Sequence, residues 1–203
     1  MSLKDRFYIL FLLGFLLAPI GDYYHVVSGT LAYPPNPFPI MFLKSPLWFP
    51  LLIGLSMGVL ACLYPILDKS LRVQIRINKF PRALLGVSLA IALYIASSYL
   101  PWKNAGYNDF VLALSAIILW WVFDRSKTGL ILGGLMAFLG TATEWILVKW
   151  SVFYYLPTAD HLDGVASWLP WLYFGATTTV GGLSRSLGAL EYSVLKIFDE
   201  ADI

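Results

Sequence analysis

Three ionisable side chains lie inside strongly apolar stretches of the sequence, where a charged group is costly. Asp22 and His25 belong to the first such stretch and Glu144 to the fifth. An acid near the centre of a membrane-spanning helix costs about 2.5 to 3.5 kcal/mol on insertion scales, so each one needs a specific role. Carboxylates and an imidazole can bind the polar head of a ligand or act as acid and base. A metal site is not expected, because a single histidine gives thin support for one.

A second group of charges interrupts the apolar sequence at LWWVFDRSKTGL, Leu119 to Leu130. Asp124 can pair with Arg125 or Lys127, or it can cap the positive end of the helix that follows. The sequence contains no HExxH, the motif of a catalytic zinc, and its GLSMG (Gly54–Gly58) has the GxSxG spacing but lies within an apolar stretch rather than at the strand-to-helix turn that would expose a serine nucleophile. We therefore predict no catalytic residues, and we expect a protein that is not an enzyme.

The composition requires lipid as the solvent for much of the chain. Of its 203 residues, 59% are hydrophobic and only 13% are charged, with a mean hydropathy of +0.72. Soluble domains carry about 25% charged residues. The net charge of +2 says little about partners, and no nucleic-acid partner is expected. The single cysteine, Cys62, excludes an internal disulfide.

Six apolar stretches must position these groups, and each is near the ~20 residues that cross a bilayer as a helix. They cover residues of about 7–31, 47–67, 83–100, 105–123, 129–149 and 168–187. The sequence thus predicts an all-α membrane protein, a bundle of six transmembrane helices forming a single domain over residues 1–203. Gly54 and Gly58 form a GxxxG pattern, which favours close helix packing in lipid.

The basic residues predict the orientation of this bundle. Eleven lie on one side of the predicted spans: Lys4, Arg6, Lys69, Arg72, Arg76, Lys79, Arg82, Arg125, Lys127, Arg185 and Lys196. Three lie on the other side: Lys44, Lys103 and Lys149. By the positive-inside rule, both termini are expected in the cytoplasm.

This arrangement brings the three ionisable groups of the apolar stretches to one level. At 1.5 Å per residue, Asp22 and His25 lie ~22–27 Å along the first helix from Phe7. Glu144 lies ~22 Å along the fifth from Gly129, which runs in the same direction. Two interpretations remain open. Each group can extend to the outer interface, or the three together can receive the head group of a buried amphipathic ligand.

At the level of motifs, the sequence resembles the Insig (insulin-induced gene) family, six-span membrane proteins that sense sterols. WWVFDRSKTGL is similar to the family signature WWxFDRSxSG, and SWLPWLYFGATTTVGGLSRSL is similar to SWLPCxFFxGGxTxGNIGRQL. AFLGTATEWILV and the LYPILD ending of the second span also resemble family patterns. The similarity covers most of the chain from about residue 47 onward.

The resemblance implies roles at matching positions. Asp124 matches an aspartate that the family needs to bind its membrane partner, a sterol-sensing escort protein. Trp120 matches a residue of the sterol pocket, and Tyr107 or Asn108 is the nearest candidate for a further polar pocket residue. Glu144 stands where the family has a glutamine. No cofactor is expected, but a bound lipid is.

From the residues and the resemblance together we predict a non-enzymatic lipid-binding or lipid-sensing protein. It would hold a sterol-like or diacylglycerol-like lipid between helices, with Glu144, Asp22 and His25 at the polar end and Trp120 as a wall. The alternatives are an intramembrane lipid-modifying enzyme that uses Glu144 or His25, and a small transporter. The small-residue faces allow a homo-oligomer. The expected location is the cytoplasmic membrane in a prokaryote or the endoplasmic reticulum membrane in a eukaryote.

Overall fold

The structure is a computed structural model that describes residues 1–35, 40–75, 77–100, 104–157 and 159–201, with side chains described up to residue 189. These residues form six helices, as predicted: α1 (Leu3–Ser28), α2 (Trp48–Ser70), α3 (Phe80–Ser97), α4 (Ala105–Phe123), α5 (Lys127–Lys149) and α6 (Leu169–Ala201). Five of them, α1 to α5, are long and apolar enough to cross a membrane. The all-α membrane architecture is therefore confirmed.

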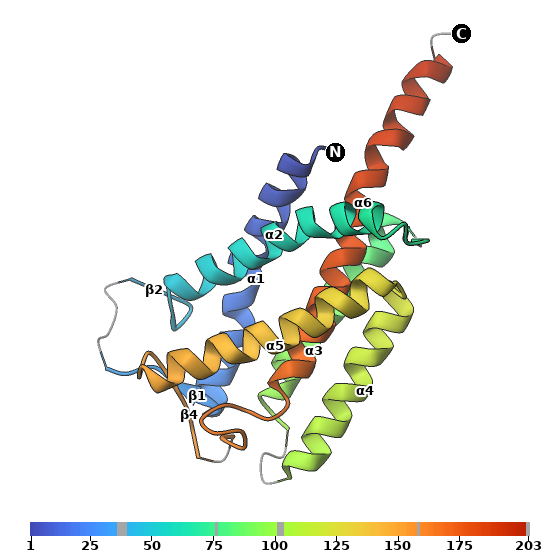
Figure 1. Cartoon of the computed structure of the whole chain (residues 1–203). Coiled ribbons are helices and arrows are strands. Elements are labelled where there is room, and N and C mark those ends of the chain that lie inside the picture. The colour runs from blue at the N-terminus through green and yellow to red at the C-terminus, as the bar shows by residue number, and fades with distance from the viewer. Residues whose placement is uncertain (36–39, 76, 101–103, 158, 202–203) are drawn as a thin grey trace.

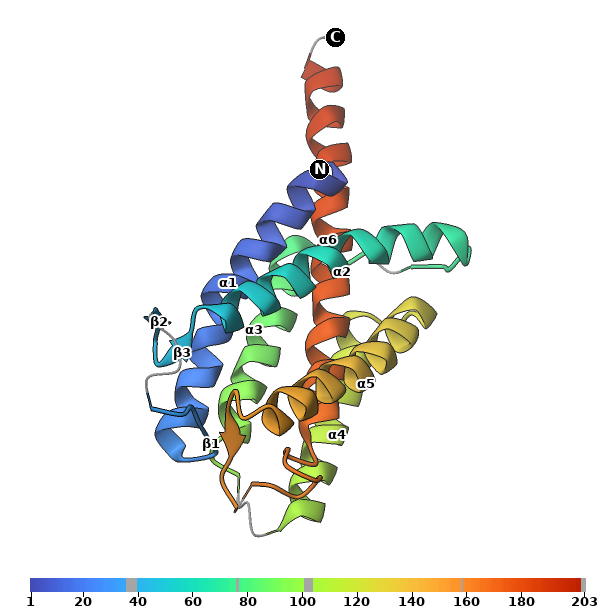
Figure 2. The same cartoon turned by 60° about the vertical axis from the view of Figure 1, so that its left-hand side comes forward.

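Helix α6 differs from the prediction in its length and its role. It does not end near residue 187 but continues to Ala201, past the rest of the bundle (Figure 1). It contacts each of the other five helices and so forms the centre of the bundle (Figure 2). Its small and polar side chains Thr177, Thr178, Thr179 and Ser184 are buried there. A polar helix is tolerated in a membrane when protein, rather than lipid, surrounds it.

Helices α1 and α2 approach each other closely at glycines. A Cβ atom on Gly54 would lie 2.8 Å from the carbonyl oxygen of Phe11, and one on Gly58 would lie 2.9 Å from the ring of Phe7. A Cβ on Gly14 would in turn lie 3.0 Å from the Cα of Gly54. The predicted GxxxG contact is therefore confirmed as an intramolecular one.

Two short strand pairs, which were not predicted from the sequence, close one end of the bundle. Strand β1 (Leu31–Ala32) pairs antiparallel with β4 (Tyr154–Tyr155), and β2 (Met41–Phe42) pairs with β3 (Ser45–Pro46). The β1–β4 pair ties the segment after α1 to the segment after α5. It thereby brings Tyr33 and Tyr155 toward the ends of those helices.

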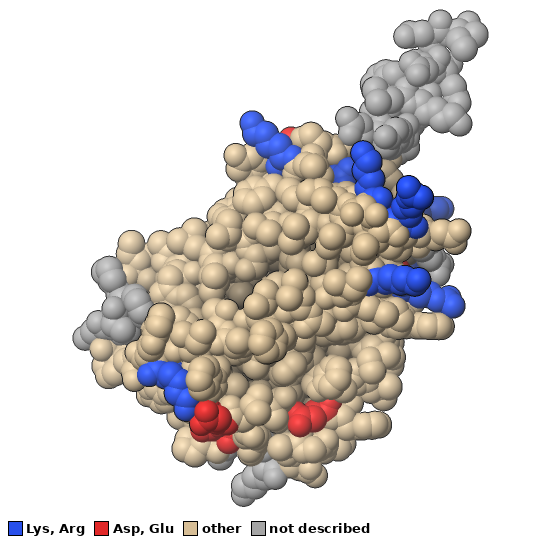
Figure 3. Space-filling view, in the orientation of Figure 1, with Lys and Arg blue, Asp and Glu red and all other residues tan. Residues whose placement is uncertain are grey.

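Exposed basic side chains gather at the opposite end, near the N terminus, the end of α2 and the α4–α5 turn (Figure 3). They are Lys4, Lys69, Arg72, Lys79, Arg82, Arg125 and Lys127. Arg185 does not belong with them, because it is buried within α6. Arg76 and Lys103 lie outside the described residues, as does the side chain of Lys196.

Candidate functional site

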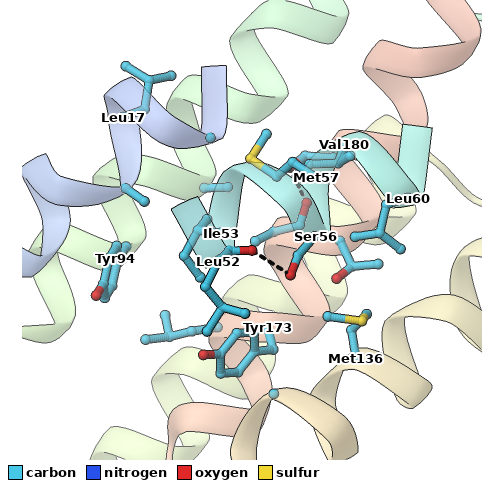
Figure 4. Close-up of a pocket in the computed structure, with 18 of the residues that line it drawn as sticks. Leu17, Leu52, Ile53, Ser56, Met57, Leu60, Tyr94, Met136, Tyr173 and Val180 are labelled. Carbon is cyan, nitrogen blue, oxygen red and sulfur yellow. Dashed lines mark hydrogen bonds between the residues drawn. The ribbon is translucent and has the colours of Figure 1, made fainter. Parts of the chain in front are cut away.

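A cavity of about 400 Å³ lies inside the bundle, between α1, α2, α3, α5 and α6 (Figure 4). Its volume is within the range of small-molecule sites in proteins. Most of its wall is aliphatic: Leu17, Leu52, Ile53, Met57, Leu60, Ile91, Met136, Leu172 and Val180. The apolar walls arise because these spans are apolar around much of their circumference. Such a wall suits a hydrocarbon group.

One side of the cavity is polar, and Glu144 of α5 is at its centre. The two carboxylate oxygens of Glu144 each accept a hydrogen bond of 2.6 Å, one from the hydroxyl of Tyr155 and one from that of Tyr173. Figure 4 shows Tyr94 and Tyr173 on the same side of the cavity, with Leu60 and Met136 on the other. The cavity therefore has an amphipathic lining.

A second cavity of about 30 Å³, enough for one or two water molecules, shares Tyr94, Glu144 and Tyr173 with the first. Asp22 and Tyr33 also line it. The structure thus brings Asp22 and Glu144 together around one small polar space, as the helix geometry predicted.

Asp22 and His25 are both held by hydrogen bonds within the protein. The Oδ2 atom of Asp22 accepts hydrogen bonds from the hydroxyls of Tyr33, at 2.9 Å, and Ser45. His25 lines neither cavity but lies behind Tyr94, with the two ring centroids 4.7 Å apart. Among the described residues, no three His, Cys, Asp or Glu side chains are placed to hold a metal ion.

The candidates from the fourth helix lie elsewhere. Trp120, Tyr107 and Asn108 line neither cavity within the described structure. The indole N–H of Trp120 donates to the carbonyl oxygen of Ser126 at 3.2 Å, which holds this ring at the α4–α5 turn. Tyr107 is 50% exposed and Asn108 is buried. The predicted wall residue Trp120 is thus placed away from the cavity, because α4 contributes nothing to its lining.

Three tyrosines that the sequence did not predict as site residues complete the polar side: Tyr94, Tyr155 and Tyr173. A buried carboxylate requires hydrogen-bond donors, so the sequence implies that donors exist. It does not identify them, because they come from α3, β4 and α6, which are far apart in the chain.

A second buried polar cluster lies at the basic end of the bundle, around Arg185. The guanidinium donates to both carboxylate oxygens of Asp68, through Nε at 2.7 Å and Nη2 at 2.8 Å. Its Nη1 atom forms an ion pair with Asp124, and Nη2 also donates to the hydroxyl of Ser126 at 2.9 Å. Arg185, Asp68 and Asp124 are only 4%, 7% and 2% exposed. The cluster joins the end of α2, the α4–α5 turn and α6.

This cluster corrects the interpretation of Asp124. Its ionic partner is Arg185, not Arg125 or Lys127. The hydroxyl of Ser126, rather than Asp124, caps α5 by accepting the backbone N–H of Gly129 at 2.9 Å. The long sequence separation between α4 and α6 hid the pairing. Gly129 itself is required for space, because a Cβ atom there would overlap Oδ2 of Asp124.

The fold and the cavity together define a class: a helical membrane protein with an internal amphipathic cavity. Comparison with known proteins identifies the family. The family described as Insulin-induced protein (INSIG) matches residues 5–188. The chain is 32% identical over 199 residues to the insulin-induced gene 2 protein of Gallus gallus, covering 96% of this chain and 86% of that protein. It is 33% identical to the insulin-induced gene 1 protein of Xenopus tropicalis, covering 92% of this chain and 73% of that protein.

Solved structures agree with the sequence comparisons. The crystal structure of MvINS, a mycobacterial Insig homologue from Mycobacterium vanbaalenii, superposes with a TM-score of 0.78 at 33% identity, covering 90% of this chain and 93% of that one. A cross-linked trimer of an MvINS cysteine variant superposes with a TM-score of 0.79, again at 33% identity, covering 91% of this chain and 94% of that one. The chain belongs to the Insig family.

Proposed function

We propose that this protein binds one amphipathic, uncharged lipid in its internal cavity and acts as a lipid sensor or lipid-binding scaffold. The observation that carries the proposal is the cavity of about 400 Å³ with aliphatic walls and a polar side around Glu144. Hydrocarbon would fill the apolar part. The few polar groups would supply most of the discrimination, since apolar walls gain little selectivity within a lipid environment.

The charges around the cavity favour a sterol-like or diacylglycerol-like ligand over an anionic one. Within the described residues, no lysine, arginine or histidine lines either cavity, whereas Asp22 and Glu144 do. A phosphate or carboxylate head would therefore meet like charge and find no counter-ion. A neutral hydroxyl can donate to a carboxylate oxygen.

The cavity has a route to the bilayer between α2 and α5. Leu52 of α2 and Leu139 of α5 line it and are 37% and 44% exposed. The molecular surface is hollowed between these two helices (Figure 3). We infer that a lipid enters sideways from the membrane, and that a long acyl chain can extend out through the same opening.

We further propose that α6 completes a six-span topology with both termini in the cytoplasm. The exposed basic residues at the end that carries the N terminus support this orientation. The protein would then lie in the cytoplasmic membrane of a prokaryote or in the endoplasmic reticulum membrane of a eukaryote.

Assembly with other membrane proteins is a further part of the proposal. The cross-linked MvINS trimer supports self-association of this chain. A partner role of Asp124 would be exerted through the shape of the α4–α5 turn, because the Asp124 side chain itself is buried against Arg185.

The geometry favours binding over catalysis. Both oxygens of Glu144 accept a tyrosine hydroxyl, and His25 lines neither cavity, so neither group is aimed at a ligand as a free base. The matched relatives bear the names of insulin-induced gene proteins and not of enzymes. We therefore propose that the protein has no catalytic activity.

A pair of substitutions tests the lipid site. Ala176 lines the cavity from α6, so Ala176→Phe would fill part of it, whereas Ala92 is exposed on α3 outside the lining. Delipidated wild type and Ala92→Phe should gain thermal stability on addition of 1,2-dioleoylglycerol or cholesterol, since a ligand stabilises the state that binds it. Ala176→Phe should not. If delipidated wild type gains nothing from any such lipid, the proposal is wrong.

A further inference from the structure

The hydroxyl of Tyr94 differs from the other tyrosine hydroxyls around the polar side of the cavity. Tyr155 and Tyr173 donate to Glu144, and Tyr33 donates to Asp22. Tyr94 lines both cavities, yet its hydroxyl has no hydrogen-bond partner within the part of the chain that the structure describes. A phenol inside a protein normally finds a partner, and this hydroxyl is available to donate to a molecule in the cavity.

The Tyr94 ring is held rigidly in this position. Gly21 of α1 lies directly against it, so that a Cβ atom on Gly21 would overlap the ring. One turn further along α1, the His25 ring also packs against it, tilted by 31°. His25 Nδ1 donates to the carbonyl oxygen of Gly21 at 2.9 Å, and His25 Nε2 lies 3.0 Å from the hydroxyl of Ser97 on α3. This clamp between α1 and α3 fixes where the Tyr94 hydroxyl can donate.

Most other hydroxyls that line the large cavity are already used. Ser56, Thr143 and Thr179 each donate to a carbonyl oxygen of their own helix, at 2.9, 2.8 and 2.9 Å. Thr177 also lines the cavity, and its hydroxyl has no partner among the described side chains. It does not line the small cavity, where Asp22 joins Glu144 beside Tyr94.

The groups around Tyr94 determine which lipid head group can bind beside it. Glu144 and Asp22 offer only acceptor oxygens when ionised, and the Tyr94 hydroxyl offers a donor. A head group that carries a hydroxyl beside a second oxygen matches these groups. Its hydroxyl can donate to a carboxylate, and its second oxygen can accept from the Tyr94 hydroxyl. An anionic head cannot donate to the carboxylates and meets no cation there.

We propose that Tyr94 is the specificity-determining residue for the head group of the bound lipid. It donates to an oxygen of an uncharged, hydroxyl-bearing head, while a carboxylate of the polar side accepts from the head's hydroxyl. This inference rests on the lipid-binding function proposed above.

The test measures the affinity of purified full-length protein in detergent for tritiated 1,2-dioleoylglycerol, with oleic acid as the anionic competitor. Tyr94→Phe keeps the ring in its clamp and removes only the hydroxyl. We expect about tenfold weaker binding of dioleoylglycerol, the effect of one lost hydrogen bond. The matched control Tyr99→Phe, which removes an exposed hydroxyl outside both cavities, should bind within about twofold of the wild type. Wild type should prefer dioleoylglycerol over oleic acid.

The stability of the ligand-free variant separates head-group recognition from a structural role. Because the Tyr94 hydroxyl has no described protein partner, ligand-free Tyr94→Phe should unfold at the wild-type temperature; a lower temperature would overturn the inference. So would wild-type affinity in Tyr94→Phe, or equal affinity of the wild type for oleic acid. These results would leave the proposed lipid site standing, whereas a wild type that binds neither probe would refute both.

Discussion

Removal of the Arg185 guanidinium should destabilise the protein more than any surface change at the same end of the bundle. Arg185→Met keeps an unbranched apolar stem but removes the guanidinium, which leaves Asp68 and Asp124 buried without a cation. Loss of one partner from a buried ion pair costs about 3 to 5 kcal/mol, because an uncompensated charge remains. Three elements would lose their connection together: the end of α2, the α4–α5 turn and α6.

The loss of stability should be larger for Arg185→Met than for substitutions of its neighbours. Asp124→Ala should cost less, since Arg185 would still bind both oxygens of Asp68. Arg125→Met is the matched control, because Arg125 is exposed and its guanidinium lies over the Trp121 ring, 4.0 Å from the ring centroid. We expect a cost below about 1 kcal/mol there.

Reversible unfolding in mixed micelles, followed by circular dichroism, provides the assay. The free energies of Arg185→Met, Asp124→Ala and the double variant form a cycle, and the coupling between the two sites should exceed about 1 kcal/mol. If Arg185→Met is as stable as Arg125→Met, the buried cluster does not hold these elements together, and our interpretation of Asp124 fails.

Three further predictions concern the ends of α5. Gly129→Ala should destabilise by about 1 to 3 kcal/mol in the same assay, because its Cβ overlaps Asp124, whereas Gly134→Ala, with open space around it, should not. Ser151→Gly should stabilise by up to about 1 kcal/mol, since Ser151 is exposed with φ of 57°; an unchanged midpoint would contradict this. Hydrogen bonds from Lys149 and Trp145 hold the pKa of Asp163 below its ordinary value. These contacts therefore stabilise the folded state fully above the unfolded-state pKa of Asp163, and less as the pH falls through its folded-state pKa. The small stability difference between wild type and Asp163→Asn should therefore vanish in acid; a difference that grows in acid would refute the assignment.

The helices and one part of the site could be predicted from the sequence. Long apolar runs define membrane helices without knowledge of the fold, and α4 has the expected bounds, residues 105–123. The fixed rise per residue put Asp22 and Glu144 at one level, and they do share the small cavity. Height along a helix axis depends only on the sequence number, so this kind of inference succeeds.

Rotation about a helix axis and the choice of neighbours could not be predicted in the same way. Trp120 is at a plausible height but on α4, which does not line the cavity. Tyr94 and Tyr173 face the cavity because of how α3 and α6 pack, which no local pattern specifies. The pairing of Asp124 with Arg185 joins residues 61 apart in the chain, and the charged neighbours Arg125 and Lys127 masked it.

Mass spectrometry of the protein released from gentle detergent tests the central claim most directly. We predict one bound lipid per chain on the wild type, and after extraction a neutral, hydroxyl-bearing species. Ala176→Phe should lose this mass, and Ala92→Phe should keep it. A wild-type chain that carries no lipid, or only phospholipid that Ala176→Phe retains equally, would contradict the proposed function.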